Sequence, residues 1–199
     1  MNWWTDWTFG KNLYIGHAIY KIDNNADLAW EDATEIPRQI FMNREAASVD
    51  GSIHFSASKL RLNPLDIIQS LKTMYAPKTK LPEMIWLDIP PAVAPKILKP
   101  VGDENNIYLS WEKHFGITEE PYYYHIYRFE GKETGDFSDP NNIIHITPFG
   151  KKIETYVDKN IPKGSVYTYA IVAINRAHSE SNPSLKVSIL KKKKKVKVY

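Results

Sequence analysis

The sequence of 199 residues predicts an α/β segment followed by an all-β sandwich. In the first half, apolar runs alternate with stretches of helical periodicity, the pattern of βαβα units with a parallel sheet. In the second half, short alternating runs recur with turn residues between them, which is typical of a β-sandwich. The predicted domains are an α/β portion at 1–89, a stiff proline-rich linker at 90–95, a sandwich at 96–190 and a lysine-rich tail at 191–199.

The first strand is expected in the almost continuously apolar run from Asn12 to Ile22, which suits a strand buried on both faces. Thr34 is a suitable cap for the following helix, and Asp50-Gly51 ends it. Residues 52–57 form the next short strand, and Asn63-Pro64 begins a second helix. Two strands alone cannot close a barrel or make a well-covered sheet, so this half is predicted to belong to something larger.

Several short, spaced motifs in this half resemble glycoside-hydrolase-like family 10. The matching residues are Ala18-Ile19-Tyr20-Lys21, Trp30, Glu35-Ile36, Gln39-Ile40, Asn43-Arg44, Gly51, Phe55-Ser56, Leu60, Asn63, Leu71, Tyr75, Leu81-Pro82, Met84, Trp86 and Pro90-Pro91. The resemblance covers about residues 1–93 and implies the seventh and eighth βα units of a TIM-type barrel, with the exit from it. It also implies action on polysaccharides, and at least one branch of the family is linked to peptidoglycan glycan strands.

Barrel geometry indicates which residues of this half would face a substrate, because TIM-barrel sites gather at the carboxyl ends of the strands. The predicted substrate-binding residues are Trp4, His17, Tyr20, Lys21 and Ser56. His17 stands where the family often has Gln. The alternatives are structural: tryptophans at a domain edge can be core or interface residues, and a lone histidine in an apolar strand can be a satisfied core residue.

No catalytic residue is assigned from this sequence. The acids near the first strand's exit, from Asp23 to Glu35, are explained by turn formation and helix capping. The resemblance implies that the acid and base lie on earlier strands, so the 199-residue chain alone is expected to be inactive. The histidines and acids lack metal-ligand spacing, and no metal or other cofactor is predicted.

The strands of the second half alternate clearly. Ile107, Leu109 and Trp111 share one face of a strand, and further strands are expected at 122–129, 143–146, 154–157, 167–174 and 185–190. The run Tyr122-Tyr123-Tyr124 could offer a sugar-stacking surface, but alternation points Tyr123 away from its neighbours, which favours packing within the strand.

The second half resembles a fibronectin type III or immunoglobulin-like sandwich. The residues that carry the resemblance are Trp111, Tyr167, Tyr169, Ile171, Ala173, Asn175, Ser179, Ser181 and Pro183-Ser184. Tyr167 occupies the tyrosine-corner position, where a hydroxyl bonds to upstream backbone. Such modules serve as spacers, adhesion surfaces and enzyme appendages alike, so the resemblance predicts the fold and leaves the function open.

Composition excludes several classes of function. The chain has no cysteine, so a disulfide framework, a thiol nucleophile and a cysteine-ligated metal are ruled out. The net charge is +3, and Lys191 to Lys195 alone supply five positive charges, so the rest is close to neutral and no nucleic-acid partner is expected. No apolar run approaches the roughly 20 residues of a membrane span. No signal peptide is recognised at the start of this chain.

The leading hypothesis is that the intact protein hydrolyses polysaccharide, outside the cytoplasm or in the cell envelope, with a glycan as its partner. The alternative is a non-enzymatic fibronectin type III-like binding or adhesion module. Because the strands that would flank 12–22 and 52–57 in a barrel are missing, residues 1–90 are expected to self-associate or pack loosely. The lysine-rich tail is expected to extend the last strand.

Overall fold

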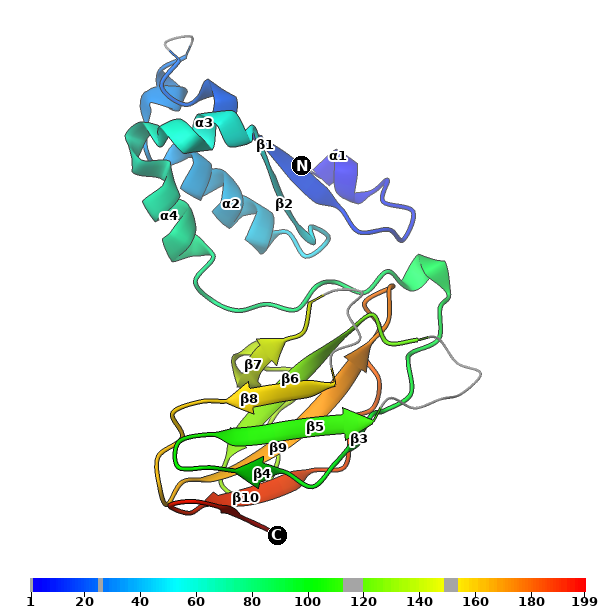
Figure 1. Ribbon diagram of the computed structural model, residues 1–199. Coiled ribbons are helices and arrows are strands. Elements are labelled where there is room, and N and C mark those ends of the chain that lie inside the picture. The colour runs from blue at the N-terminus through cyan, green and yellow to red at the C-terminus, as the bar shows by residue number, and fades with distance from the viewer. Residues whose placement is uncertain (1, 25–26, 113–119, 149–153) are drawn as a thin grey trace. The chain divides into compact units, whose positions relative to one another are not determined.

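The computed structural model describes residues 2–24, 27–112, 120–148 and 154–199 (Figure 1). The chain divides into two compact units, residues 1–78 and 79–199. Residues 79–95 therefore belong to the unit that contains the sandwich, whereas the sequence places 79–89 with the α/β portion.

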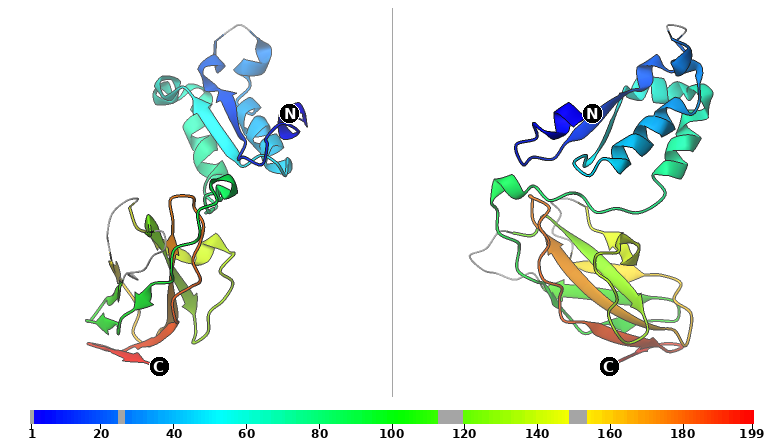
Figure 2. Two further views of the ribbon diagram at one scale, coloured as in Figure 1. Left: turned by 90° about the vertical axis from the view of Figure 1, so that its right-hand side faces the viewer. Right: turned by 180° about the vertical axis from the view of Figure 1, so that it is seen from behind.

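Unit 1 contains a parallel pair of strands with its two longest helices on one side of it (Figures 1 and 2). Its elements are α1 (Asn2–Thr5), β1 (Tyr14–Ala18), α2 (Glu35–Glu45), β2 (Gly51–Phe55), α3 (Ala57–Leu62) and α4 (Ile67–Met74). The pairing runs in register from Tyr14 opposite Gly51 to Ala18 opposite Phe55. The predicted βαβα order and parallel pairing are confirmed.

Two details of the first strand differ from the prediction. The strand ends at Ala18, and Ile19–Lys21 form a 3-10 helix in place of its last residues. The strand is also not buried on both faces: within β1 only His17 is buried. The reason is that helices cover one face of this two-stranded sheet, and the core of unit 1 is a cluster of isoleucines on that side. Its buried members are Ile19, Ile22, Ile36, Ile40 and Ile67.

Unit 2 is a β-sandwich of two antiparallel sheets, which confirms the predicted all-β class (Figure 1). The larger sheet has the order β11-β10-β9-β6-β7; in the smaller one, β3 and β4 pair with successive parts of β5, and β8 also pairs with β5. The strands are β3 (Lys96–Ile97), β4 (Val101–Gly102), β5 (Ile107–Glu112), β6 (Tyr123–Glu130), β7 (Ile143–Ile146), β8 (Thr155–Asp158), β9 (Val166–Ile174), β10 (Val187–Lys191) and β11 (Val196–Val198).

The larger sheet of unit 2 is covered on both faces. Its inner face meets β5, where Ile107, Leu109 and Trp111 are buried in the alternation that the sequence predicts. Its outer face carries a second cluster, to which Tyr123 and Phe129 belong. Tyr123 and its neighbour Tyr124 are both buried, one in each cluster, so the packing interpretation of the tyrosine run is confirmed for these two residues.

The predicted tyrosine corner at Tyr167 is wrong. The hydroxyl with a buried partner is that of Tyr169, which is fully buried and donates to Asp158 Oδ2 at 2.7 Å. Asp158 lies on β8 in the facing sheet and also accepts from Arg128 Nη1 at 2.9 Å. Tyr167 lies only partly buried, with the Arg128 guanidinium 4.7 Å from its ring centroid.

The prediction that the tail extends the last strand is also wrong. The chain reverses within the lysine run, where Lys192 N donates to Lys195 O at 2.9 Å, and β11 returns antiparallel to β10. The return strand is stabilised because Val196 and Val198 pack against the core between the sheets.

Candidate functional site

A buried polar network joins β1, β2 and α2, and His17 is at its centre. The His17 side chain, which is 1% exposed, lies with Nδ1 3.0 Å from Gln39 Oε1 and Nε2 2.9 Å from Asn43 Nδ2. Gln39 Nε2 donates to Glu35 Oε1 at 2.7 Å, so Gln39 Oε1 is free to accept from His17. Asn43 can only donate through Nδ2. Ser52 Oγ of β2 also lies 3.0 Å from His17 Nε2, so side chains of α2 and β2 contact both ring nitrogens.

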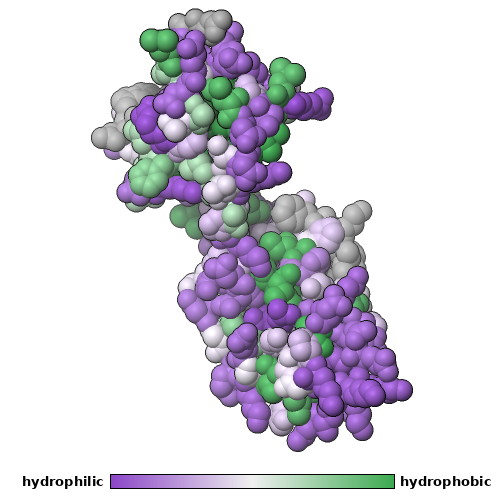
Figure 3. Space-filling model, turned by 90° about the vertical axis from the view of Figure 1, so that its left-hand side faces the viewer, coloured by the Kyte–Doolittle hydropathy of each residue, from purple (hydrophilic) through white to green (hydrophobic). Residues whose placement is uncertain are grey.

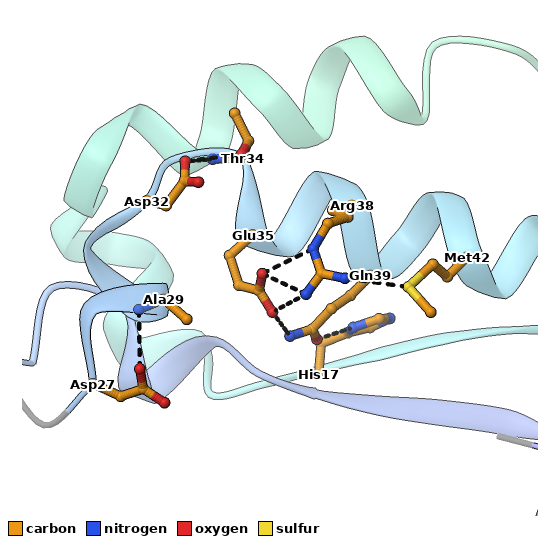
Figure 4. Close-up of polar contacts among 9 residues, drawn as sticks. All are labelled: His17, Asp27, Ala29, Asp32, Thr34, Glu35, Arg38, Gln39 and Met42. Carbon is orange, nitrogen blue, oxygen red and sulfur yellow. Dashed lines mark hydrogen bonds and ion pairs between the residues drawn. The ribbon is translucent and has the colours of Figure 1, made fainter.

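Figure 4 shows this chain of contacts continuing from His17 through Gln39 to Glu35 and Arg38. Glu35 accepts from Gln39 and Arg38, and these bonds hold the pKa of its carboxyl below the usual range. A cavity of about 250 Å³ lies beside the network, lined by Ile15, His17, Glu35, Arg38, Gln39, Met42 and Asn43. Because both ring nitrogens of His17 have partners within the chain, this histidine positions α2 on the strands, as a satisfied core residue does.

A second histidine lies against His17. The rings of His17 and His54 stack with their centroids 5.3 Å apart, and His54 Nε2 lies 2.9 Å from the Tyr75 hydroxyl. Burial, together with the neighbouring His17, lowers the pKa of His54. The folded state therefore favours the neutral form of the His54 ring.

Three of the predicted substrate-binding residues follow the carboxyl ends of the strands. Tyr20 lies just after β1, is 45% exposed, and meets the ring of Phe55 edge-to-face at 5.8 Å. Ser56 follows β2, with Oγ 2.7 Å from Ser58 Oγ. Lys21 is exposed, with Nζ 5.4 Å from the Trp30 ring centroid. Tyr20 and the end of β2 are thus brought together, and their arrangement offers an aromatic edge beside hydroxyl groups.

Trp4, the remaining predicted residue, lies on α1 before β1 and is 58% exposed. The residue that sequence reasoning missed is Phe55, which is 65% exposed although it lies on a strand. The signal that could have found it is the period-2 pattern of β2: Ser52 and His54 face the helix layer, so Ile53 and Phe55 face the other way.

The acids near the strand exit act locally, as the sequence predicts. Asp27 Oδ1 accepts from Ala29 N at 3.1 Å, and Asp32 Oδ1 accepts from Thr34 N at 2.8 Å (Figure 4). The bonds from Thr34 lower the pKa of Asp32. In the part of the chain that the structure describes, no group of three or more metal-ligating side chains is found. No helix among these residues has the length and apolar character to cross a membrane.

Comparison with known proteins gives one curated relative that matches nearly the whole chain. No family model matches. The glycosyl hydrolase YngK of Bacillus subtilis (strain 168) is 37% identical over 188 residues, which cover 92% of this chain and 36% of the relative. The chain therefore spans about a third of the length of that relative, and the match extends through both units.

Solved structures resemble about half of the chain. The third fibronectin III domain of the human KIAA0343 protein is 17% identical, covers 52% of this chain and 84% of that one, and has a TM-score of 0.39. A β-1,2-glucanase from Parabacteroides distasonis is 26% identical, covers 50% of this chain and 13% of that one, and has a TM-score of 0.33. Since both scores are below 0.5, the sandwich fold rests on the strand order and packing described above.

Proposed function

We propose that this chain is the C-terminal portion of a glycoside hydrolase that acts on polysaccharide. The observation that carries the proposal is the 37% identity to YngK over 92% of the chain. A match confined to the sandwich would indicate only a common appended module, whereas this one includes the α/β unit.

In this proposal, β1, α2, β2 and α4 are the last two βα units of a TIM-type barrel. The parallel pairing and the helices on one side of it support this arrangement. On the other side, Ile53 in the middle of β2 is 57% exposed, and the remaining strands and interior side chains of a barrel would cover it. Phe55 is 65% exposed at the carboxyl end of β2, where a barrel opens to its substrate. A barrel would also account for the two-stranded sheet of unit 1, because the other strands of that barrel would come from the rest of the protein.

The carboxyl ends of β1 and β2 then contribute to the substrate cleft. The rings of Tyr20 and Phe55 pack on the apolar face of a sugar, while the hydroxyl of Ser56 and the ammonium group of Lys21 bind polar groups of the glycan. Trp4 adds a further aromatic surface, and His17 acts indirectly by positioning α2. The catalytic acid and base come from the preceding strands, so this chain alone does not turn over substrate. The proposed substrate is a peptidoglycan glycan strand, and the proposed location is the cell envelope.

A chimera tests the proposal: this chain replaces the aligned segment of YngK, and turnover is measured on peptidoglycan strands and on any other polysaccharide that unaltered YngK cleaves. The chimera is expected to retain activity. Phe55→Ala in the chimera is expected to lower kcat/KM by roughly tenfold or more, because stacking on a sugar is lost. Phe41→Ala is the matched control, since Phe41 is also exposed but lies on α2.

Two results would contradict the proposal. One is a folded but inactive chimera, and in that case glycan binding by the isolated chain would favour the binding-module alternative. The other is hydrolysis by the isolated 199-residue chain that disappears when one of its own acids is changed.

A further inference from the structure

The lysine run is a fixed structural feature of unit 2. Lys191 ends β10 and is 1% exposed, and its Nζ donates to the carbonyl oxygens of Asp103, Glu104 and Lys192. The backbone of Lys191 is held as well, by Gly164 N and Ser165 O on the turn before β9. The first lysine of the run therefore anchors the hairpin, and the next four form its turn.

The lysines of the turn point outward and keep most of their charge unneutralised. Lys192 to Lys195 are all exposed. Lys194 Nζ lies 3.7 Å from Glu104, whereas within the described residues Lys192, Lys193 and Lys195 make no ion pair. Without the run from 191 to 195 the net charge of the chain changes from +3 to −2, so the positive field is concentrated at this turn. The end of the sandwich that bears the turn faces the viewer in Figure 3, and hydrophilic side chains predominate there.

The positive surface continues along β11, the edge strand of the larger sheet. Lys197 is exposed in the middle of β11, and the ring of Tyr199 follows it, 51% exposed. Lys132 Nζ lies 4.3 Å and Lys197 Nζ 4.8 Å from the centroid of this ring. The neighbouring acid, Glu133, forms an ion pair with Lys186. From Lys195 to Tyr199 this stripe of cations and one aromatic ring is roughly 13 Å long.

We propose that this stripe, from the Lys192–Lys195 turn along β11 to Tyr199 and Lys132, binds an anionic polysaccharide chain. The ammonium groups pair with carboxylate or phosphate groups that repeat along the polymer, and the Tyr199 ring packs against a sugar. The proposal is independent of the hydrolase function, because the stripe lies entirely on the sandwich.

Other polyanions fit the stripe less well. Stable attachment to a membrane surface needs apolar groups beside the cations, but Val196 and Val198 of β11 pack inward against the core. Nucleic acid presents a broad, dense array of phosphates, which would also meet the rest of the chain, whose net charge is negative. A single polysaccharide chain is thin enough to follow an edge strand without that repulsion.

The test measures binding of the full chain to alginate, which carries carboxylates, and to phosphomannan, which carries phosphates, with neutral dextran as the uncharged comparison. Binding is expected to one or both anionic glycans and to weaken as salt is raised. The variant Lys192→Gln/Lys193→Gln/Lys195→Gln is expected to lose roughly tenfold in affinity, since three exposed charge contacts of a few-fold each are removed. The matched control, Lys11→Gln/Lys72→Gln/Lys99→Gln, removes three exposed lysines elsewhere and should keep the affinity.

A further variant separates a glycan site from general attraction of charge. Tyr199→Ala is expected to weaken binding to the anionic glycan several-fold while leaving the weak attraction to vesicles of phosphatidylcholine and phosphatidylglycerol unchanged. The proposal is overturned if neither glycan binds, if the two triple variants lose affinity equally, or if the vesicles or duplex DNA bind more tightly than the glycans.

Discussion

The two units differ in how many faces of their sheets are covered. In unit 1, α2 and the isoleucine cluster cover one face of β1 and β2, while Ile53 and Phe55 lie exposed on the other. In unit 2, the larger sheet packs on β5 with one face and carries the Tyr123 and Phe129 cluster on the other. The comparison indicates that the sandwich buries enough apolar surface for a stable domain, whereas unit 1 depends on a much smaller core.

The largest effect is expected from the core of the sandwich. Trp111 is 2% exposed and contacts the Tyr124 ring edge-to-face at 5.3 Å. Trp111→Ala should lower the free energy of unfolding of unit 2 by about 3–5 kcal/mol, because it leaves a large cavity between the sheets. Hydrogen exchange measured by peptide should show faster exchange across unit 2 and no change in unit 1. Equally faster hydrogen exchange in both units would contradict the conclusion that each unit has its own core.

A core substitution in unit 1 should lower the free energy of unfolding by less than Trp111→Ala does. It should nevertheless unfold the whole of its own unit. Ile40→Ala removes part of a fully buried side chain and is expected to cost about 2–4 kcal/mol. Since unit 1 has little core to spare, this change should unfold residues 12–75 while exchange in the sandwich stays slow. The adjacent exposed change Phe41→Ala, expected within about 0.5 kcal/mol of wild type, is the control.

The hydroxyl of Tyr169 provides a finer test of the sandwich. Tyr169→Phe removes a buried donor to Asp158 and should lower the stability of unit 2 by about 1–3 kcal/mol. Tyr167→Phe should change it by less than about 0.5 kcal/mol. Unfolding by guanidinium gives the stability of both variants. A larger loss of stability for Tyr167→Phe than for Tyr169→Phe would support a tyrosine corner at Tyr167.

The pH dependence of unit 1 should reveal the burial of His54 beside His17. The folded state lowers the pKa of His54, so the unfolded chain takes up a proton first as the pH falls below about 6.5. Unit 1 should therefore lose stability as the pH falls from that value to the folded-state pKa, and keep it fully at higher pH. His54→Phe, which preserves a ring between His17 and Tyr75, should flatten this slope in unfolding measured at several pH values. An unchanged slope would assign the effect to other groups.

The exposed face of unit 1 gives the smallest change in stability. Ile53→Lys on β2 should alter the free energy of unfolding by less than about 0.5 kcal/mol, because the side chain is already exposed. It should nevertheless reduce self-association of the chain in sedimentation velocity experiments, since an apolar face is replaced by a charge. A chain that is monomeric before the change would show that this face does not recruit other copies.

The sequence predicted which faces of individual strands and helices are buried, because the periodicity within one segment determines this. The alternation of Ile107, Leu109 and Trp111 fixes which face of β5 is inside, and the helical spacing of Ile36 and Ile40 does the same for α2. The sequence could not choose between Tyr167 and Tyr169, because two residues apart on a strand they share a face. The choice depends on the position of Asp158, which comes from the other sheet.

The candidate site was predicted in part for the same reason. The sequence places Tyr20 and Ser56 after the ends of β1 and β2, and this requires only the strand boundaries. Whether His17 faces the open side or the helices depends on the alternation within β1, which a nearly continuous apolar run conceals. The hairpin in the lysine run could not be predicted, because the packing of Val196 and Val198 on a distant core decides it.

Residues 79–95, which precede the first strand of the sandwich, determine where the sandwich could be separated and exchanged as a unit. Met84 N donates to Ala177 O at 2.8 Å, Asn175 Nδ2 donates to Pro90 O at 2.9 Å, and Lys80 pairs with Glu180 at 2.8 Å. A recombination event at the prolines would strip these partners from the loop at 175–180 and leave a buried asparagine unsatisfied. The piece that can be inherited intact as a sandwich cassette therefore begins near residue 79, ahead of the prolines.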